Sequence, residues 1–484
     1  MPASTRTPRP SSFALVIAPL LLLAPAGATA QAAHPFAGTW QGTLSVQAVE
    51  LRIVFHIHAV PDGGLTATMD SPDQGATGIA VSGVTLEHDT VRIQVAAIRG
   101  TYVGTFSADG DTLHGTWSQG AASLPLDLVR VPEAEAAAPP ERPQEPKPPY
   151  PYRAEDVRVE NPDAGVTLAG TLTIPRGTGP FPGVVLVTGS GPQDRNETLL
   201  GHKPFLILAD HLTRQGIAVL RYDDRGVGGS TGDFGAATSE DFTSDALAAL
   251  SFLRNRPEVD PNGVGIIGHS EGGLIAPIAA VRSDAVKFIV MLAGPAVRGD
   301  EIILYQGELI ARAAGVSEKY IELNQHTQRA LFKVVQEEPD TAAAAPTLRE
   351  ILQSAIDSLP ADEREKALQG GSVDAQIKRI NSPWFRFFLT YDPRPTLERV
   401  RVPTLALFGE KDMQVPDEQN AAPMRAALAD DTDATVTVLP GLNHLFQTAE
   451  TGAPTEYARI AETMSPTALN TISRWILDRF GPKG

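Results

Sequence analysis

The chain has 484 residues, of which 42% are hydrophobic and 20% charged, with a formal net charge of −17 and no cysteine. At roughly 100–200 residues per domain, this length predicts two or three domains, and the composition is typical of folded proteins. The acidic balance argues against nucleic-acid binding, which needs a basic face. The absence of cysteine excludes disulfides, thiolate metal sites and a cysteine nucleophile, so any catalysis must use oxygen and nitrogen groups.

Residues 1–30 have the pattern of a secretory signal peptide. Arg6 and Arg9 precede the apolar run Phe13–Leu23, and the segment ends in small residues up to Ala30. The apolar run is too short for a membrane-spanning helix, which needs about 20 residues. We therefore expect cleavage after Ala30, export to the periplasm or the medium, and no stable membrane insertion after cleavage. An uncleaved N-terminal anchor is the alternative.

Residues 31–131 alternate apolar and polar positions in short runs. Leu51–His58 and Val91–Val95 are examples, and turns rich in glycine and aspartate, such as 61–64, separate these runs. Short strands at this spacing are typical of an antiparallel sheet, a sandwich or a small barrel. We therefore expect a small antiparallel all-β accessory domain. A proline-rich linker follows at 132–152, because its composition cannot bury a core and favours an extended spacer.

From residue 153 to residue 484, short apolar strands alternate with helices. The predicted strands are Val184–Thr188, Ala218–Tyr222, Val264–Ile267, Phe288–Leu292, Thr404–Phe408 and Thr435–Leu439. Such strands with helical crossovers predict a mostly parallel sheet with helices on both faces. Between about 297 and 392 polar helical stretches interrupt the alternation, namely Glu301–Ala314, Ser317–Glu338, Thr347–Ser358 and Ala361–Gln369. We expect this insertion to form a helical lid over the site.

Two segments match the G-x-S-x-G motif of a nucleophile elbow, in which a strand runs through a tight turn into a helix. Ser270 follows a predicted strand and precedes an apolar helical stretch, so its context fits the motif. Ser230 follows polar residues and precedes no helix start, so we interpret it as a loop residue. Ser270 is therefore the nucleophile candidate, and a serine nucleophile needs a general base that a third group orients.

Two histidines follow Ser270 in the chain. His444 comes directly after the last predicted strand, where a loop can direct it at Ser270, so we predict that it is the base. His326 lies in a predicted helix of the insertion, and a solvated surface position explains it.

The acid is expected in the segment that follows the strand Thr404–Phe408. Asp412 is the first choice, and Glu410 and Asp417 are the alternatives. Its role would be to fix the tautomer of His444 and to stabilise the imidazolium that forms during the reaction.

Acyl transfer also requires hydrogen-bond donors for the oxyanion that develops. We expect one donor in the backbone amide of Glu271, the residue after the nucleophile. The second is expected in the glycine-rich loop after Val184–Thr188, where Ser190 is the first choice and Gly191 the alternative.

Five motifs, in this order along the chain, resemble the α/β-hydrolase superfamily, and more narrowly the bacterial esterases of the esterase D type and the serine aminopeptidase-like hydrolases. They begin at Gly189 (GSGPQDRNE), Tyr222 (YDDRGVGGS), Gly268 (GHSEGG), Gly409 (GEKD) and Leu442 (LNH). The resemblance covers residues 153–484. It implies an α/β-hydrolase fold, a Ser270–Asp412–His444 triad, hydrolysis of small carboxylic esters, and no cofactor.

Two other residue patterns were considered as a metal site and a phosphate-binding loop, and neither is predicted. His56 and His58 lie on one face of a predicted strand, but no third ligand stands out nearby, so we expect no metal site. The glycines at 226–229 lack the Lys-Ser/Thr of a phosphate-binding loop.

The sequence thus predicts an exported serine hydrolase that cleaves small-molecule carboxylic esters through an acyl-enzyme and has no nucleic-acid partner. One alternative is a peptidase or amidase of the serine aminopeptidase-like group. Another is an envelope-binding protein in which the β domain acts and the hydrolase domain is vestigial. The presence of a serine, an acid and a histidine at the motif positions argues against the second alternative.

Overall fold

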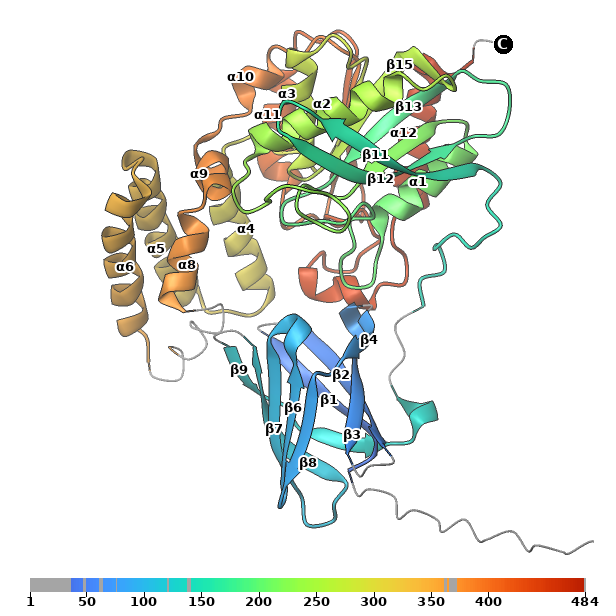
Figure 1. Ribbon diagram of the computed structural model, residues 1–484. Helices are drawn as coiled ribbons and strands as arrows, with labels where there is room; N and C mark the ends of the chain where they lie inside the picture. The colour runs from blue at the N-terminus through green and yellow to red at the C-terminus, as the bar shows by residue number, and fades with distance from the viewer. Residues whose placement is uncertain are drawn as a thin grey trace, which may run out of the picture.

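The computed structural model describes residues 36–46, 49–60, 64–74, 76–119, 122–136, 141–360, 364 and 372–482. These residues form a sheet of ten strands, a sheet of eight strands and a group of helices beside the second sheet (Figure 1). The predicted signal peptide and its cleavage at Ala30 lie outside the described residues. Among the described helices, none is both long and apolar enough to cross a membrane.

The N-terminal sheet is antiparallel, as predicted. Its strands are β1 (Gly38–Val46), β2 (Val49–Ala59), β3 (Leu65–Ser71), β4 (Ala76–Ala80), β5 (Gly83–Glu87), β6 (Thr90–Val95), β7 (Gly100–Phe106), β8 (Thr112–Gln119), β9 (Ala122–Pro125) and β10 (Leu128–Val131). They lie in the order β4-β3-β2-β1-β10-β8-β7-β6-β5, with β9 paired to β8. In β6, Val91, Ile93 and Val95 are buried and the residues between them are exposed, so one face covers a core. The aromatic side chains buried in that core are Phe36, Trp40, Phe55, Tyr102 and Trp117.

The second sheet is mostly parallel and carries helices. Its strands are β11 (Arg153–Asn161), β12 (Val166–Ile174), β13 (Phe181–Val187), β14 (Ala218–Tyr222), β15 (Val259–His269), β16 (Ile289–Leu292), β17 (Thr404–Gly409) and β18 (Ala434–Leu439). They lie in the order β11-β12-β14-β13-β15-β16-β17-β18. The helices that pack on this sheet are α1 (Pro204–Arg214), α2 (Ser239–Arg254), α3 (Gly272–Arg282), α11 (Asp417–Ala427) and α12 (Pro466–Phe480). Helices α2 and α3 lie together on one face, and α1 lies with α12 on the other (Figure 1). The predicted α/β fold is therefore confirmed.

Strands β11 and β12 were not among the predicted strands. They form an antiparallel pair at the edge of the sheet, and β12 continues antiparallel to β14. The reason is local composition. β11 is an edge strand with charged residues at most of its exposed positions, so it lacks the continuous apolar run that marks the buried parallel strands.

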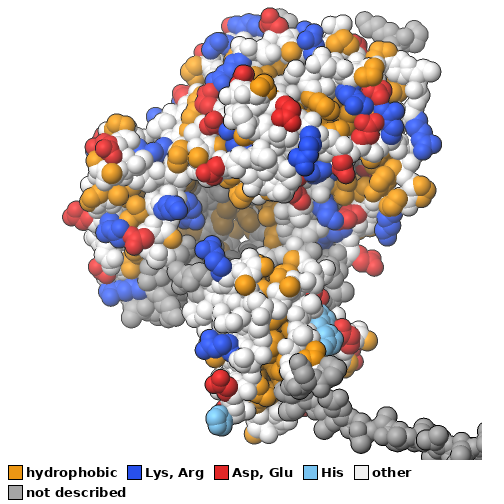
Figure 2. All heavy atoms as spheres, in the orientation of Figure 1, with side chains coloured by type: hydrophobic (Ala, Val, Ile, Leu, Met, Phe, Trp, Pro, Cys, Tyr) orange, Lys and Arg blue, Asp and Glu red, His pale blue; other side chains and the backbone are white. Residues whose placement is uncertain are grey.

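A helical insertion separates β16 from β17. Its helices are α4 (Gly299–Ala313), α5 (Glu318–Glu337), α6 (Thr341–Asp357), α8 (Val373–Ile380), α9 (Pro383–Thr390) and α10 (Arg394–Leu397). Leu331, Phe332, Leu348 and Leu389 belong to a core of its own. The predicted helix Ala361–Gln369 lies outside the described residues, apart from Arg364. Figure 2 shows a hollow between this insertion and the two sheets, with hydrophobic side chains inside it.

The described end of the proline-rich segment lies against the α/β part of the molecule. The Arg142 guanidinium donates hydrogen bonds to the carbonyls of Leu200, Ala458 and Ile460 at 2.9–3.0 Å. The Tyr152 hydroxyl donates to Asp210 at 2.8 Å. Residues 141–152 are thus bound to the α/β part through polar side chains whose partners the composition alone does not reveal.

Candidate active site

Ser270 occupies a tight turn between β15 and α3. Its φ of 53° lies in the left-handed region, and its amide donates a hydrogen bond to the Leu292 carbonyl at 2.8 Å. A Cβ atom on Gly268 would lie 1.9 Å from the Gly272 carbonyl oxygen, and one on Gly272 would lie 2.2 Å from the Val187 carbonyl oxygen. Both glycines are therefore required by close backbone packing, which is why the strand, turn and helix need the G-x-S-x-G pattern.

Ser230 has a different environment. Its hydroxyl donates to the Asp223 carbonyl at 2.7 Å and accepts from the Ala169 amide at 2.8 Å. The side chain is buried and ties the loop after β14 to β12. Ser230 therefore has a structural role, which agrees with its interpretation as a loop residue.

Asp412 and His444 form a buried pair. His444 Nδ1 lies 2.8 Å from Asp412 Oδ2, and the side chains are 6% and 0% exposed. The other carboxylate oxygen of Asp412 accepts from the amides of Gln414 and Val415. Burial acts to raise the pKa of Asp412, but His444 and the two amides outweigh it, so the pKa lies below its usual value.

The other acids and histidines considered for these positions lie elsewhere. Glu410 accepts a hydrogen bond from the Gly441 amide at 2.7 Å, and Asp417 begins α11. His326 is exposed on α5. Of the three acids, Asp412 is the one that forms a hydrogen bond with His444.

His444 lies beside the turn that carries Ser270. The neighbour of that serine, His269, has its Nε2 atom 3.0 Å from the His444 carbonyl oxygen, and the two imidazole rings are 4.8 Å apart between centroids. Ser270, Asp412 and His444 follow β15, β17 and β18, three parallel strands whose carboxyl ends meet at one edge of the sheet.

The loop after β13 is held by acidic side chains beneath it. Asp224 accepts from the Thr188 hydroxyl at 3.0 Å and from the Gln193 amide at 2.9 Å, and Glu197 accepts from the Gly189 amide at 2.7 Å. Within the described residues, the amides of Ser190, Gly191 and Glu271 donate no hydrogen bond. Both expected sources of oxyanion donors thus have free N–H groups, and the choice between Ser190 and Gly191 stays open.

Known proteins similar to this chain are hydrolases. The family model described as serine aminopeptidase, S33, matches residues 204–351. Esterase EstD of Thermotoga maritima is 28% identical over 330 residues, which cover 68% of each chain. The chain has the α/β-hydrolase fold and is similar in sequence to an esterase. The human mitochondrial acyl-coenzyme A thioesterase 2 is 27% identical over 203 residues, but these cover 41% of this chain and only 37% of that protein. The α/β hydrolase GrgF from Penicillium, a solved structure, is 14% identical with a TM-score of 0.43, over 68% of this chain and all of its own.

The helical insertion makes a direct contact with the turn that carries Ser270. The Glu271 carboxylate accepts from the Trp384 indole N–H at 2.8 Å and from the Ser239 hydroxyl at 2.6 Å. Trp384 belongs to α9, and its ring stacks on Phe388. Burial raises the pKa of Glu271. The residue with the expected oxyanion amide therefore also anchors the insertion.

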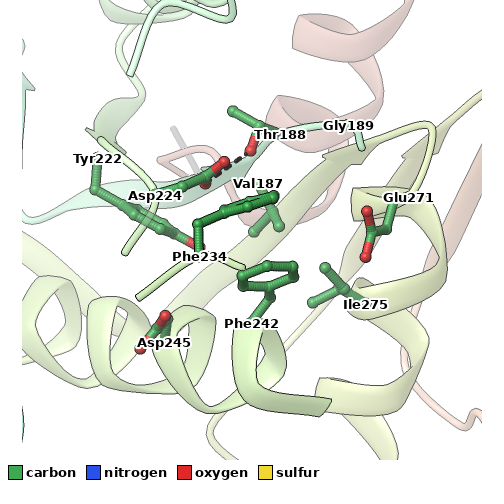
Figure 3. A pocket seen from close by; sticks show the side chains of 10 residues that line it. All are labelled: Val187, Thr188, Gly189, Tyr222, Asp224, Phe234, Phe242, Asp245, Glu271 and Ile275. Carbon is green, nitrogen blue, oxygen red and sulfur yellow. Dashed lines mark hydrogen bonds between the residues drawn. The ribbon is translucent and has the colours of Figure 1, made fainter. Parts of the chain in front are cut away.

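A small pocket lies next to Val187, Thr188 and Gly189, where the loop after β13 begins (Figure 3). Asp224 and Glu271 line it together with the aromatic rings of Tyr222, Phe234 and Phe242. Burial in these surroundings raises the pKa of Asp224 to about 8. Ser270, Asp412 and His444 are not among the residues that line this pocket.

Sequence reasoning missed four side chains of this site. Glu197, His269 and Glu271 stand inside the quoted motifs, so their proximity to the nucleophile was visible, but their contacts were not. Trp384 belongs to a helix more than one hundred residues after the nucleophile, and no local pattern connects the two.

In the described part of the chain, no three His, Cys, Asp or Glu side chains are arranged to hold a metal ion. His56 Nε2 lies 3.0 Å from a carboxylate oxygen of Asp70, and His56 Nδ1 lies 3.0 Å from one of Glu133. Each ring nitrogen of His56 thus faces a carboxylate.

Proposed function

We propose that this protein is a serine carboxylesterase in which Ser270, His444 and Asp412 form the catalytic triad. The observation that carries the proposal is the buried Asp412–His444 pair beside Ser270, a serine held at φ 53° between a strand and a helix. A serine in such a turn and a histidine oriented by a carboxylate are two of the parts that a serine nucleophile requires. The similarity to EstD, whose name is esterase, supports ester hydrolysis.

The proposed reaction has two steps. The Ser270 hydroxyl attacks the ester carbonyl carbon, His444 takes the hydroxyl proton, and the tetrahedral oxyanion accepts hydrogen bonds from the Glu271 amide and from the Ser190 or Gly191 amide. His444 then protonates the leaving alcohol, which departs from the acyl-enzyme. A water molecule attacks the acyl group with His444 as base, releasing the carboxylic acid and regenerating Ser270. Asp412 keeps its charge throughout and stabilises the imidazolium.

The remaining parts of the chain have proposed roles around this reaction. The signal-like segment 1–30 would export the protein to the periplasm or the medium. The helical insertion would act as a lid, because α9 contacts Glu271 at the nucleophile turn. The N-terminal sheet would be an accessory domain. The substrate would be a small-molecule ester, with no cofactor and no nucleic-acid partner.

Replacement of Ser270 by alanine tests the proposal. The wild-type protein is expected to react with a fluorophosphonate probe and to hydrolyse p-nitrophenyl esters, and Ser270→Ala should abolish both reactions. Ser230→Ala is the matched control, since it removes the other motif serine, and should retain labelling. Labelling that survives Ser270→Ala would reject the proposed nucleophile.

A second candidate is a peptidase or amidase, because the family model that matches residues 204–351 is described as serine aminopeptidase. The same triad can open an amide bond. Aminoacyl p-nitroanilides measured beside p-nitrophenyl esters distinguish the two activities. Anilide turnover that exceeds ester turnover would favour the peptidase.

A further inference from the structure

Glu197 and His269, the residue before the proposed nucleophile, form a second acid–histidine pair that the proposed reaction does not use. Glu197 and His269 are 4% and 6% exposed, and His269 Nδ1 lies 2.8 Å from Glu197 Oε1. The same carboxylate oxygen accepts from the Gly189 amide at 2.7 Å. The other ring nitrogen, His269 Nε2, lies 3.0 Å from the His444 carbonyl oxygen.

These contacts favour a protonated imidazole at His269 when Glu197 is a carboxylate. Both of its ring nitrogens face an acceptor, a carboxylate on one side and a carbonyl on the other. A neutral imidazole has only one N–H, so one of these two contacts would be repulsive, whereas an imidazolium donates to both. Burial alone would lower the pKa of His269, but the Glu197 carboxylate and the His444 carbonyl outweigh it, and the pKa is raised.

The pair joins three segments of the proposed site. Gly189 begins the loop expected to supply an oxyanion donor, His269 precedes Ser270, and the His444 carbonyl belongs to the loop of the proposed base. The backbone of Glu197 adopts φ 54°, a conformation that L-residues other than asparagine and aspartate rarely take. Glu197 adopts this strained conformation, and its carboxylate connects the loop at Gly189 with His269. Backbone strain of this kind is typical of functional sites.

We infer that Glu197 and His269 are positioning residues, a buried carboxylate–imidazolium pair that holds the oxyanion loop and the His444 loop in register with Ser270. The inference rests on the proposed esterase function for its kinetic consequence, but not for the charge state of the pair. The charged groups that face His269 are Glu197, Asp412 and, when protonated, His444. Both side chains are buried, so we expect their effect to fall on the transition state and not on substrate binding.

Glu197→Gln is the decisive variant, because glutamine keeps the size of glutamate and removes its charge. With the charge removed, His269 should lose one proton and one of its two contacts. We expect kcat on a p-nitrophenyl ester, normalised to sites titrated with fluorophosphonate, to fall at least tenfold while KM changes less than threefold. His269→Gln should show a similar fall, and the double variant should lose less than a further threefold, because the two residues act as one unit.

Two control variants make the same chemical changes on the surface of α5. Glu322→Gln and His326→Gln replace exposed residues and should leave kcat and KM unchanged. A Glu197→Gln enzyme with wild-type kcat for each titrated site would overturn the inference. So would a fall that comes only from fewer titratable sites, since that indicates a folding defect and not misplaced groups.

The charge state can be measured without any activity. In Ser270→Ala protein labelled with ¹⁵N-histidine, the His269 signals, assigned by their loss in His269→Gln, should show two protonated ring nitrogens at pH 7. Glu197→Gln should convert them to the neutral pattern. A neutral His269 in the presence of Glu197 would overturn the inference even if Ser270 proves to be the nucleophile. A protein that lacks esterase activity would reject the proposed function and leave this measurement to decide the charge state of the pair.

Discussion

Two carboxyl groups near Ser270 have opposite pKa shifts, because different groups surround them. Asp412 faces His444 and two backbone amides, which outweigh its burial and lower its pKa. Asp224 accepts hydrogen bonds too, but it is buried beside aromatic rings and close to the carboxylates of Glu271 and Glu197. Burial dominates there and raises its pKa to about 8. At neutral pH one group is therefore a charged partner for the histidine, and the other is mainly neutral.

Asp412→Asn should remove the charged partner of His444 while preserving its size. An amide cannot stabilise the imidazolium and can bind the wrong tautomer, so we expect kcat to fall by about 10³–10⁴-fold. Steady-state ester hydrolysis at pH 7 measures this fall. Glu410→Gln and Asp417→Asn, which replace the two alternative acids, should change kcat less than threefold. A larger loss in either control than in Asp412→Asn would identify a different acid.

Asp224 predicts a pH dependence of stability. Its carboxyl has a pKa of about 8 in the folded protein and about 4 when unfolded, so between these values the unfolded chain binds fewer protons. The free energy of unfolding should therefore decrease as pH rises from about 4 to 8. Asp224→Asn removes this dependence, because the amide cannot ionise, and it should raise the Tm more at pH 8 than at pH 5. The exposed control Asp163→Asn should give equal Tm changes at both pH values.

Helix α9 connects the insertion to the turn that carries Ser270. Its Trp384 indole donates to Glu271 next to Ser270, and its ring stacks on Phe388 of the same helix. Helix α9 also packs against α4 and α5 of the insertion. Movement of the insertion away from the turn must therefore break a hydrogen bond to a buried carboxyl group.

Trp384→Phe should break this hydrogen bond and keep most of the aromatic surface. We expect the free energy of unfolding to fall by about 1–2 kcal/mol, together with a slower reaction of Ser270 with fluorophosphonate. Trp475→Phe is a matched control, because the Trp475 indole N–H is buried and has no hydrogen-bond partner among the described residues. That control should lose stability only through packing and should keep the labelling rate. Equal labelling rates for both variants would contradict a link between α9 and the turn.

Residues 141–152, the segment before β11, are bound to the α/β part of the molecule. Arg142 donates to carbonyls in two separate loops, and Gln144 bonds with the backbone of Thr463 and Met464. Arg459, at the end of the short 3-10 helix Pro454–Arg459 of the α/β part, lies 3.8 Å from Glu50 of β2 and forms an ion pair with it. The α/β part therefore extends N-terminal to its first strand.

Arg142→Ala should destabilise the α/β part. Three hydrogen bonds from a guanidinium group would be lost, and we expect a cost of about 2 kcal/mol, equivalent to a fall in Tm of about 3 °C for a part of this size. Differential scanning calorimetry measures this change. Arg142→Lys should recover little, since an ammonium group cannot match the planar fork of donors. Lys147→Ala, at an exposed position of the same segment, should leave the Tm unchanged.

The sequence predicted those parts of the molecule that depend on neighbours along the chain. The buried parallel strands are continuous apolar runs, and Ser270 lies in a local strand–turn–helix pattern, so both were predictable. Asp412 and His444 follow strands whose carboxyl ends meet in any parallel sheet. The contact between Glu197 and His269 was not predictable, because it joins residues 72 positions apart. The edge strand β11 was not predicted because few of its residues are apolar. The contacts of Arg142 were not predicted because they join residues far apart in the chain.

The hydrogen bond between Trp384 and Glu271 makes the insertion and the nucleophile turn thermodynamically linked. Linkage of this kind is reciprocal: if the position of α9 changes the affinity of the turn for an oxyanion, then occupation of the turn changes the stability of α9 by the same free energy. In the proposed site, the phosphoryl oxygen of a phosphonate ester on Ser270 would accept a hydrogen bond from the Glu271 amide. We therefore expect hydrogen exchange in α9 to change when Ser270 is labelled, although the two segments are more than one hundred residues apart in the chain.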